Sequence, residues 1–281
     1  MLLTHTLLVL AVQVGPNQST IPPTDLHQEM RDREPQAPAE TLEDPESLWL
    51  AECLALLDQD ASRAHTMAQL QRNASSGTER VLANHCLGLA ATELGLWDDA
   101  ITAFEAARDE TPAFEMRAKA RFGMMAGNAA LGAYDIPRAE ALLMQAKIDA
   151  SASGSAPLQS IAATDLARAM VSMGRPEAAL VELEEATSLA PDNPESWLLK
   201  ATLLRRLERY AEAQPAIDRA GELAPSDPAV GLEAGVIALF DGREDAARAS
   251  WQSVIALAPG SDAAETAQGY LAQITQEPIQ P

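Results

Sequence analysis

Residues 194–227 read PESWLLKATLLRRLERYAEAQPAIDRAGELAPSD, and related segments lie on both sides of this stretch. Residues 160–193 read SIAATDLARAMVSMGRPEAALVELEEATSLAPDN, and residues 228–261 read PAVGLEAGVIALFDGREDAARASWQSVIALAPGS. Residues 81–114, VLANHCLGLAATELGLWDDAITAFEAARDETPAF, form a fourth copy. A recurring unit of 34 residues is typical of a stacked repeat protein, in which each unit buries its apolar face against its neighbours.

Three positions of the unit explain why it should fold as two packed helices. The eighth position is small, as in Gly88, Ala167, Ala201 and Gly235, and the twentieth is Ala in Ala100, Ala179, Ala213 and Ala247. The twenty-fourth is bulky, as in Phe104, Leu183, Ile217 and Trp251. A small residue lets two antiparallel helices approach, and the bulky side chain fills the remaining space. Gly95, Gly174 and Gly242 suit the turn between the helices, and a proline ends the second helix.

The unit resembles the tetratricopeptide repeat family, whose pattern is W-x2-L-G-x2-Y … A-x3-F … P. The residues that carry the resemblance in the best copy are Trp197, Tyr210, Ala213, Ala220 and Pro225. Lys200 and Glu208 depart from it, since Leu and Gly are usual there. The resemblance implies an all-α fold: a right-handed α-solenoid of about six helix hairpins closed by a C-terminal capping helix.

We expect the solenoid to span residues 47–261, with a capping helix over residues 262–276. The expected repeats lie near residues 47–79, 81–114, 118–151, 160–193, 194–227 and 228–261. The third repeat is irregular, with helices expected over residues 114–131 and 138–150 and a turn two residues longer than the family turn. The Ser- and Gly-containing stretch at residues 151–157 predicts a flexible loop after it.

The first 46 residues differ from the rest. Residues 1–14 contain an apolar run that is short for a membrane span, and they are interpreted as a signal peptide or an apolar N-terminal segment. Residues 15–46 are acidic and rich in proline, which predicts a disordered linker. We therefore expect an exported, periplasmic protein with possible N-terminal membrane association; a cytoplasmic location is the alternative. The 17 Arg, 3 Lys and abundant Ala suggest a GC-rich bacterial source.

Composition and motifs argue against several classes of function. A net charge of −21 disfavours nucleic acid and anionic lipid as partners. The sequence contains no phosphate-binding, nucleophile-elbow or dinucleotide motif, so we expect neither catalysis nor a cofactor. The four histidines lack metal-ligand spacing; a composite site of Cys53, His65, His85 and Cys86 is a remote alternative. Cys53 and Cys86 are expected to be buried packing residues, with a disulfide left open as the less favoured alternative.

In the family, the first helices of the repeats line a concave groove at positions 2, 5, 6, 9, 12 and 13. The resemblance therefore implies these partner-binding residues: His85, Leu89, Lys119, Phe122, Arg168, Leu198, Thr202, Arg205, Arg206, Leu232, Val236 and Phe240. The Lys and Asn pair with which some members bind a C-terminal carboxylate is absent. An apolar groove edged by arginines suits an amphipathic helix or an extended peptide. Alternatively, the apolar residues pack between hairpins or under the capping helix.

These observations predict a non-catalytic scaffold that binds a protein or peptide, in the role of an envelope complex assembly factor. Two alternatives stay open: an accessory subunit of an enzyme complex, and a self-associating structural solenoid. The oligomeric state is not predicted.

Overall fold

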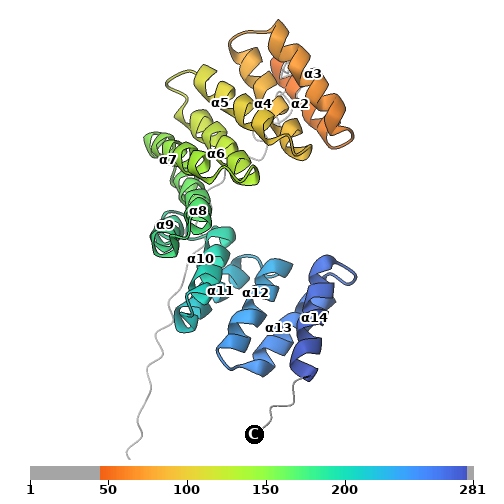
Figure 1. The fold of residues 1–281 in the computed structure, drawn as a ribbon, viewed down its shortest axis with the longest axis vertical. Helices are drawn as coiled ribbons and strands as arrows, with labels where there is room; N and C mark the ends of the chain where they lie inside the picture. Colours follow the sequence, from red (N-terminus) through yellow and green to blue (C-terminus); the bar gives the residue numbers. More distant parts are fainter. Residues whose placement is uncertain (1–44, 277–281) are drawn as a thin grey trace, which may run out of the picture. The chain divides into compact units, whose positions relative to one another are not determined.

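The computed structural model describes residues 45–276, and this part of the chain is entirely helical (Figure 1). Its first helices in chain order are α2 (Pro45–Leu57), α3 (Ala61–Ala74), α4 (Thr78–Glu93), α5 (Trp97–Glu110), α6 (Met116–Gly132) and α7 (Ile136–Ala152). They are followed by α8 (Ala156–Ser172), α9 (Pro176–Leu189), α10 (Pro194–Arg206), α11 (Tyr210–Leu223), α12 (Pro228–Phe240), α13 (Glu244–Leu257) and α14 (Asp262–Gln276). The expected N-terminal segment 1–14 lies outside the described residues, as does the linker up to residue 44.

Consecutive helices form six antiparallel hairpins, and α14 follows the last of them (Figure 1). Each hairpin packs on the next, and the first helices α6, α8, α10 and α12 stack in order. We call the surface made by the first helices the first-helix face. Tyr270, Leu271 and Ile274 of α14 pack against the cluster around Trp251 at the end of the stack. The predicted all-α solenoid of about six hairpins with a closing helix is confirmed for this part of the chain.

The small and bulky positions of the repeat meet as the sequence predicts. A Cβ atom added to Gly88 would lie 2.5 Å from a ring carbon of Phe104, and one added to Gly235 would overlap the indole of Trp251. Phe104 and Trp251 are among the largest fully buried side chains of the described residues. The missing side chain on one helix therefore makes room for the ring on the other.

The predicted register of the 34-residue unit in the third hairpin is wrong by two residues. A Cβ added to Gly127 would lie 2.5 Å from Leu143, so Gly127 occupies the eighth position and Leu143 the twenty-fourth. Ala139 then falls at the twentieth position, and the unit runs over residues 120–153 instead of 118–151. The turn after α6 contains Ala133, Tyr134 and Asp135, which is the same three-residue length as in the neighbouring hairpins. The expectation of a longer turn is therefore also wrong.

The extra residues of this region lengthen helices and do not form a loop. Helices α6, α7 and α8 each contain 17 residues, whereas α10 and α12 contain 13. Helix α7 continues to Ala152, and α8 begins at Ala156, so most of the expected flexible loop over residues 151–157 is helical. Ala-rich sequence on both sides explains this outcome, because alanine is the strongest helix former.

In five of the six described hairpins, the middle residue of the turn between the two helices has left-handed backbone geometry. Gly95, Gly174 and Gly242 have φ angles of 68°, 70° and 76°, while Tyr134 and Glu208 have φ angles of 59° at the equivalent places. Glycine adopts this conformation without a steric cost, whereas for a residue with a Cβ atom the conformation costs about 1–2 kcal/mol.

We predict that Glu208→Gly stabilises the protein. Relief of the left-handed strain exceeds the extra entropy that glycine gives the unfolded chain, so the free energy of unfolding should rise by about 0.5–1 kcal/mol. Urea unfolding followed by circular dichroism measures the change. Gly242→Glu is the reciprocal control and should lower stability, since Gly242 has the same turn geometry. A destabilised Glu208→Gly variant would contradict the argument.

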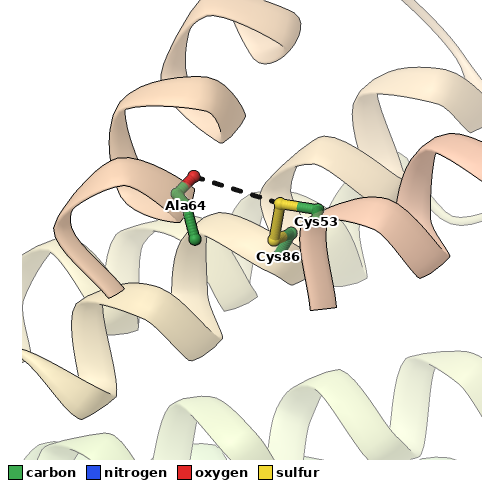
Figure 2. Close-up of a disulfide and its surroundings, with 3 residues drawn as sticks. All are labelled: Cys53, Ala64 and Cys86. Carbon is green, nitrogen blue, oxygen red and sulfur yellow. Dashed lines mark hydrogen bonds between the residues drawn. A yellow bond between two sulfur atoms is a disulfide. The ribbon is translucent and has the colours of Figure 1, made fainter. Parts of the chain in front are cut away.

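The two cysteines form a disulfide between α2 and α4, contrary to the favoured expectation (Figure 2). The Cα atoms of Cys53 and Cys86 lie 6.4 Å apart, and both side chains are fully buried. The Cys53 sulfur also lies 3.9 Å from the carbonyl oxygen of Ala64; because a disulfide sulfur carries no proton, we interpret this as packing. The expectation was wrong because it assumed that near-equivalent positions on two stacked helices point in similar directions, whereas the side chains of Cys53 and Cys86 point toward each other between α2 and α4.

Candidate partner-binding surface

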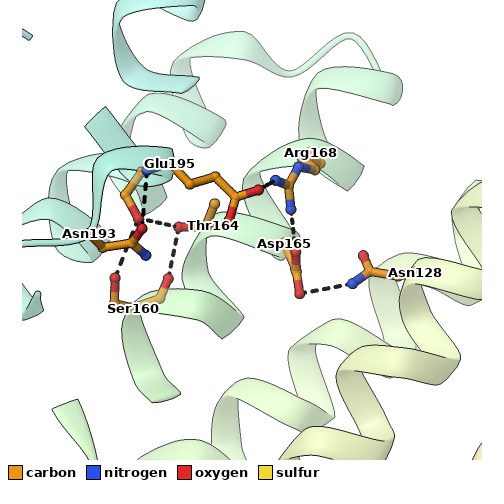
Figure 3. A network of polar contacts seen from close by, with 8 residues as sticks. Asn128, Ser160, Thr164, Asp165, Arg168, Asn193 and Glu195 are labelled. Carbon is orange, nitrogen blue, oxygen red and sulfur yellow. Dashed lines mark hydrogen bonds and ion pairs between the residues drawn. The ribbon is translucent and has the colours of Figure 1, made fainter. Parts of the chain in front are cut away.

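A chain of polar contacts crosses three hairpins on the first-helix face (Figure 3). Asn128 of α6 donates a hydrogen bond to Asp165 of α8 over 3.0 Å. Arg168, one turn further along α8, forms ion pairs with Asp165 and with Glu195 of α10. These contacts fix the positions of α6, α8 and α10 relative to one another and hold the Arg168 guanidinium between two carboxylates.

Asp165 is a buried carboxylate within this network, with a side chain that is 6% exposed. Burial raises the pKa of Asp165, and the nearby positive charge of Arg168 opposes part of that rise. Beneath it, the Ser160 hydroxyl donates to the Ala186 carbonyl oxygen over 2.9 Å, and the Thr164 and Ser196 hydroxyls lie 2.9 Å apart. Buried hydroxyls that satisfy one another in this way fix the register between α8 and α10.

A pocket of about 220 Å³ opens next to this network, between α8 and α10. Its apolar wall contains Ala167, Val171, Leu183, Leu199 and Leu203. Its polar groups come from Thr164, Arg168, Thr202 and Arg206. Three residues predicted from the resemblance, Arg168, Thr202 and Arg206, therefore meet in one pocket. We call it the α8–α10 pocket.

Arg205 and Arg206 have different environments although they are neighbours in the sequence. The Arg205 Nε donates to Glu233 of α12 over 2.6 Å, so its charge is compensated inside the fold. Arg206 is exposed, and no described carboxylate lies within the 4.0 Å ion-pair distance of its guanidinium. Successive residues on a helix point about 100° apart, which sends Arg205 toward α12 and Arg206 into the pocket. Arg206 is thus the uncompensated positive charge of this site.

His85 and Phe122 line a second cavity, of about 570 Å³, with ring centroids 5.3 Å apart in an edge-to-face arrangement. Burial lowers the pKa of His85, so its imidazole is neutral at pH 7. The cavity is also lined by residues that were not predicted: Phe114, Glu115, Met116, Arg117, Ala118, Arg121, Met125, Ala152 and Ser153. We call it the α4–α6 cavity.

The other predicted residues lie outside both cavities. Leu89 and Leu198 pack against the buried clusters between hairpins, and Leu232 and Val236 pack on the cluster that α14 covers. These four contacts match the alternative interpretation of the apolar residues as core. The Lys119 amine donates to the Arg108 carbonyl oxygen over 3.1 Å.

Phe240 stays largely exposed at the end of α12. Its side chain is 58% exposed, and its ring stacks on that of Tyr210 with centroids 5.8 Å apart.

Arg121 and Met125 were missed because the third repeat was placed two residues too early. With Gly127 at the eighth position, Arg121 falls at position 2 and Met125 at position 6, both groove positions of the family. The signal was present in the sequence, since Ala139 and Leu143 match the twentieth and twenty-fourth positions only in this register.

The described residues contain no group of three or more His, Cys, Asp or Glu side chains arranged to hold a metal ion. The composite site of Cys53, His65, His85 and Cys86 is wrong as proposed, because both sulfurs are consumed in the disulfide. Within residues 45–276, no helix combines the length and apolarity that crossing a bilayer requires.

Stacked helix hairpins of this kind define the class of α-helical repeat proteins. A tetratricopeptide-repeat family model matches residues 170–236, which span α9 to α11 and parts of α8 and α12. This match and the fold agree with the resemblance of the repeats to the tetratricopeptide-repeat family. No curated protein matches the sequence.

Several solved structures share the fold at low sequence identity. PilF of Pseudomonas aeruginosa has 18% identity and a TM-score of 0.60, and the match covers 80% of this chain and 97% of PilF. TTC0263, a thermophilic tetratricopeptide-repeat protein of Thermus thermophilus, has 21% identity and a TM-score of 0.53, with 68% and 99% covered. A chain of the APC/C hetero-tetramer Cut9–Hcn1 has 16% identity and a TM-score of 0.61, with 87% and 44% covered. At these identities the likeness concerns the fold.

Proposed function

We propose that this protein is a non-catalytic scaffold that binds a segment of a partner protein in the α8–α10 pocket. The observation that carries the proposal is the position of Arg206, an uncompensated guanidinium beside an apolar wall of leucine, valine and alanine side chains. A peptide with an apolar anchor and a neighbouring carboxylate fits these two features. Arg168 contributes less charge, because Asp165 and Glu195 already neutralise it.

A photo-cross-linking experiment in the source cells tests this proposal. Ser172 is exposed on α8 next to Val171 of the pocket wall, so a photo-reactive amino acid at this position should label the bound segment. Glu184 on α9 is also exposed but lines no part of the pocket, and it supplies the matched control position. We expect one specific adduct from position 172 and none from position 184. Equal labelling from both positions, or none from either, contradicts the proposal.

Once the partner is identified, we predict that Arg206→Glu weakens its binding. Loss of one charge-assisted contact and the new repulsion cost about 1–2 kcal/mol, which is roughly tenfold in Kd. Titration calorimetry with the purified partner measures the change, and circular dichroism should stay the same because Arg206 has no described ion pair. Arg205→Glu is unsuitable for this test because it would break the ion pair with Glu233. An effect on folding could then not be distinguished from an effect on binding.

We also propose that the protein works in an oxidising compartment, as part of an envelope assembly. The buried Cys53–Cys86 disulfide supports this, because structural disulfides persist outside the reducing cytosol. The apolar run within residues 1–14 agrees with export. Fractionation with N-terminal sequencing of the mature chain tests the proposal. A new terminus near residue 15 supports it, and a chain that keeps Met1 with reduced cysteines in the cytoplasm refutes it.

A further inference from the structure

The α4–α6 cavity lies where the third hairpin departs from the regular 34-residue unit. Met116, Arg117 and Ala118 belong to the additional first turn of α6, and Ala152 belongs to the additional last turn of α7. Helices α4 and α6 also approach each other less closely than the other consecutive first helices of the described chain. The inserted turns thus form walls of a cavity that a regular unit would not have.

The cavity has an aromatic entrance. Phe114, which lines it, is 84% exposed, whereas Phe122 is buried and Met125 is half-buried. An exposed phenylalanine beside methionine and a second aromatic ring is a feature of sites that accept a large apolar side chain. The volume of about 570 Å³ is sufficient for such a side chain and the backbone around it.

Two arginines without a described ion pair lie together at the entrance. Ten described arginines form ion pairs with carboxylates, but Arg117 and Arg121 have no described carboxylate within 4.0 Å. They are four residues apart on α6, which places them one turn apart on the same face. Glu115 is the one carboxylate in the lining, so the cavity is positive within a chain of net charge −21.

We propose that the α4–α6 cavity binds an acidic segment of a partner protein, with one large apolar side chain beside Phe114 and two carboxylates on Arg117 and Arg121. Two guanidiniums one helical turn apart match two carboxylates with similar spacing, and each contact is a charge-assisted hydrogen bond. The apolar anchor supplies affinity, and the arginines supply the preference for acidic sequence. The α4–α6 cavity is separate from the α8–α10 pocket. This second proposal rests on the proposed function only because it also takes the ligand to be a segment of a partner protein.

Fluorescence anisotropy with the full chain tests the proposal. The probe is a fluorescein-labelled peptide of about ten residues with a central Trp and two carboxylates on each side, a length that spans one site of this size. Matched peptides carry Gln and Asn instead of the acids, or Ala instead of the Trp. We expect the acidic Trp peptide to bind about tenfold more tightly than the neutral one, with the preference falling as salt rises.

Variants of the protein test whether the peptide binds in this cavity or at another surface. Arg117→Glu with Arg121→Glu should weaken the acidic Trp peptide about tenfold or more, because attraction becomes repulsion. Phe114→Ala should weaken the Trp peptide and leave the Ala peptide unchanged; this exposed side chain contributes little to folding. Arg72→Glu is the matched control, since Arg72 also lacks a described ion pair and lines neither cavity, and it should leave the affinity unchanged.

Three results would overturn the proposal: no binding of the acidic peptide, equal binding of the acidic and neutral peptides, or no effect of the double charge reversal. A change in sedimentation coefficient on charge reversal, without a change in peptide affinity, would assign the face to self-association and also overturn it. Failure of cross-linking from position 172 would concern the α8–α10 pocket alone, so the two proposals fail separately.

Discussion

Trp251→Ala should destabilise the C-terminal end of the protein by about 3–5 kcal/mol, the cost of removing a large, fully buried aromatic side chain. Trp251 is 1% exposed, its indole Nε1 donates to the Leu232 carbonyl oxygen over 3.2 Å, and its ring packs on Tyr270 of α14. Because each hairpin is stabilised mainly by its neighbours, the loss should appear as local opening of α12–α14. Hydrogen exchange resolved by helix measures it, and protection of α4–α7 should stay unchanged.

Gly235 provides a sharper form of the same test. Gly235→Ala in the natural chain forces a methyl group onto the indole and should cost about 1–3 kcal/mol. In the Trp251→Leu background the same change recreates the Ala167–Leu183 pair of another hairpin, and it should be neutral or stabilising because Ala favours helix. A double-mutant cycle measures this coupling. Equal effects of Gly235→Ala in both backgrounds would show that the two positions do not share space.

Removal of the disulfide should have an effect of similar size at the other end of the chain. Cys53 and Cys86 are 33 residues apart, and a cross-link that closes a loop of this length contributes about 4 kcal/mol in the chain-entropy model. Cys53→Ala with Cys86→Ala should therefore lower the protection of α2 and α3 against hydrogen exchange. Helices α8–α14 should keep theirs, because the affected hairpin contacts only its neighbours.

Reduction of the natural protein supplies the control for this prediction. Strong reductant with denaturant, followed by refolding in reductant, should reproduce the behaviour of the double alanine variant. If α2 and α3 keep full protection without the cross-link, then packing of Trp49, Leu50 and Met67 on this cluster is sufficient to hold them. That result would refute the stabilising role assigned to the disulfide.

The sequence predicted the repeat fold well because its information is local and periodic. Gly88 with Phe104 and Gly235 with Trp251 identify the two helices of a hairpin by their complementary volumes. The third hairpin was placed wrongly because the prediction assigned its extra residues to a turn and a loop. The separation of Gly127 and Leu143 along the sequence indicates the correct register. This becomes clear only when it is compared with the separation between the eighth and twenty-fourth positions in the regular hairpins.

The binding surface was less predictable because it depends on contacts between hairpins. Arg205 and Arg206 look alike in the sequence, and only the position of Glu233 on α12 shows which of them is already compensated. The disulfide depends in the same way on how α2 lies against α4. Family positions indicate which helix faces the groove, whereas ion pairing between neighbouring hairpins decides which charges stay free for a ligand.

The cross-link between α2 and α4 has a consequence for how the protein comes apart. A linear stack of hairpins ordinarily unzips from its ends, where each unit has a single neighbour. Here one end is tied covalently and the other is covered by α14. We therefore expect heating to open the interior first, between the hairpins α8–α9 and α10–α11, which pack on each other least extensively of the neighbouring hairpins in the described chain. The α8–α10 pocket lies at this junction, so a ligand bound in the pocket would hold together the two hairpins that separate first and should raise the melting temperature.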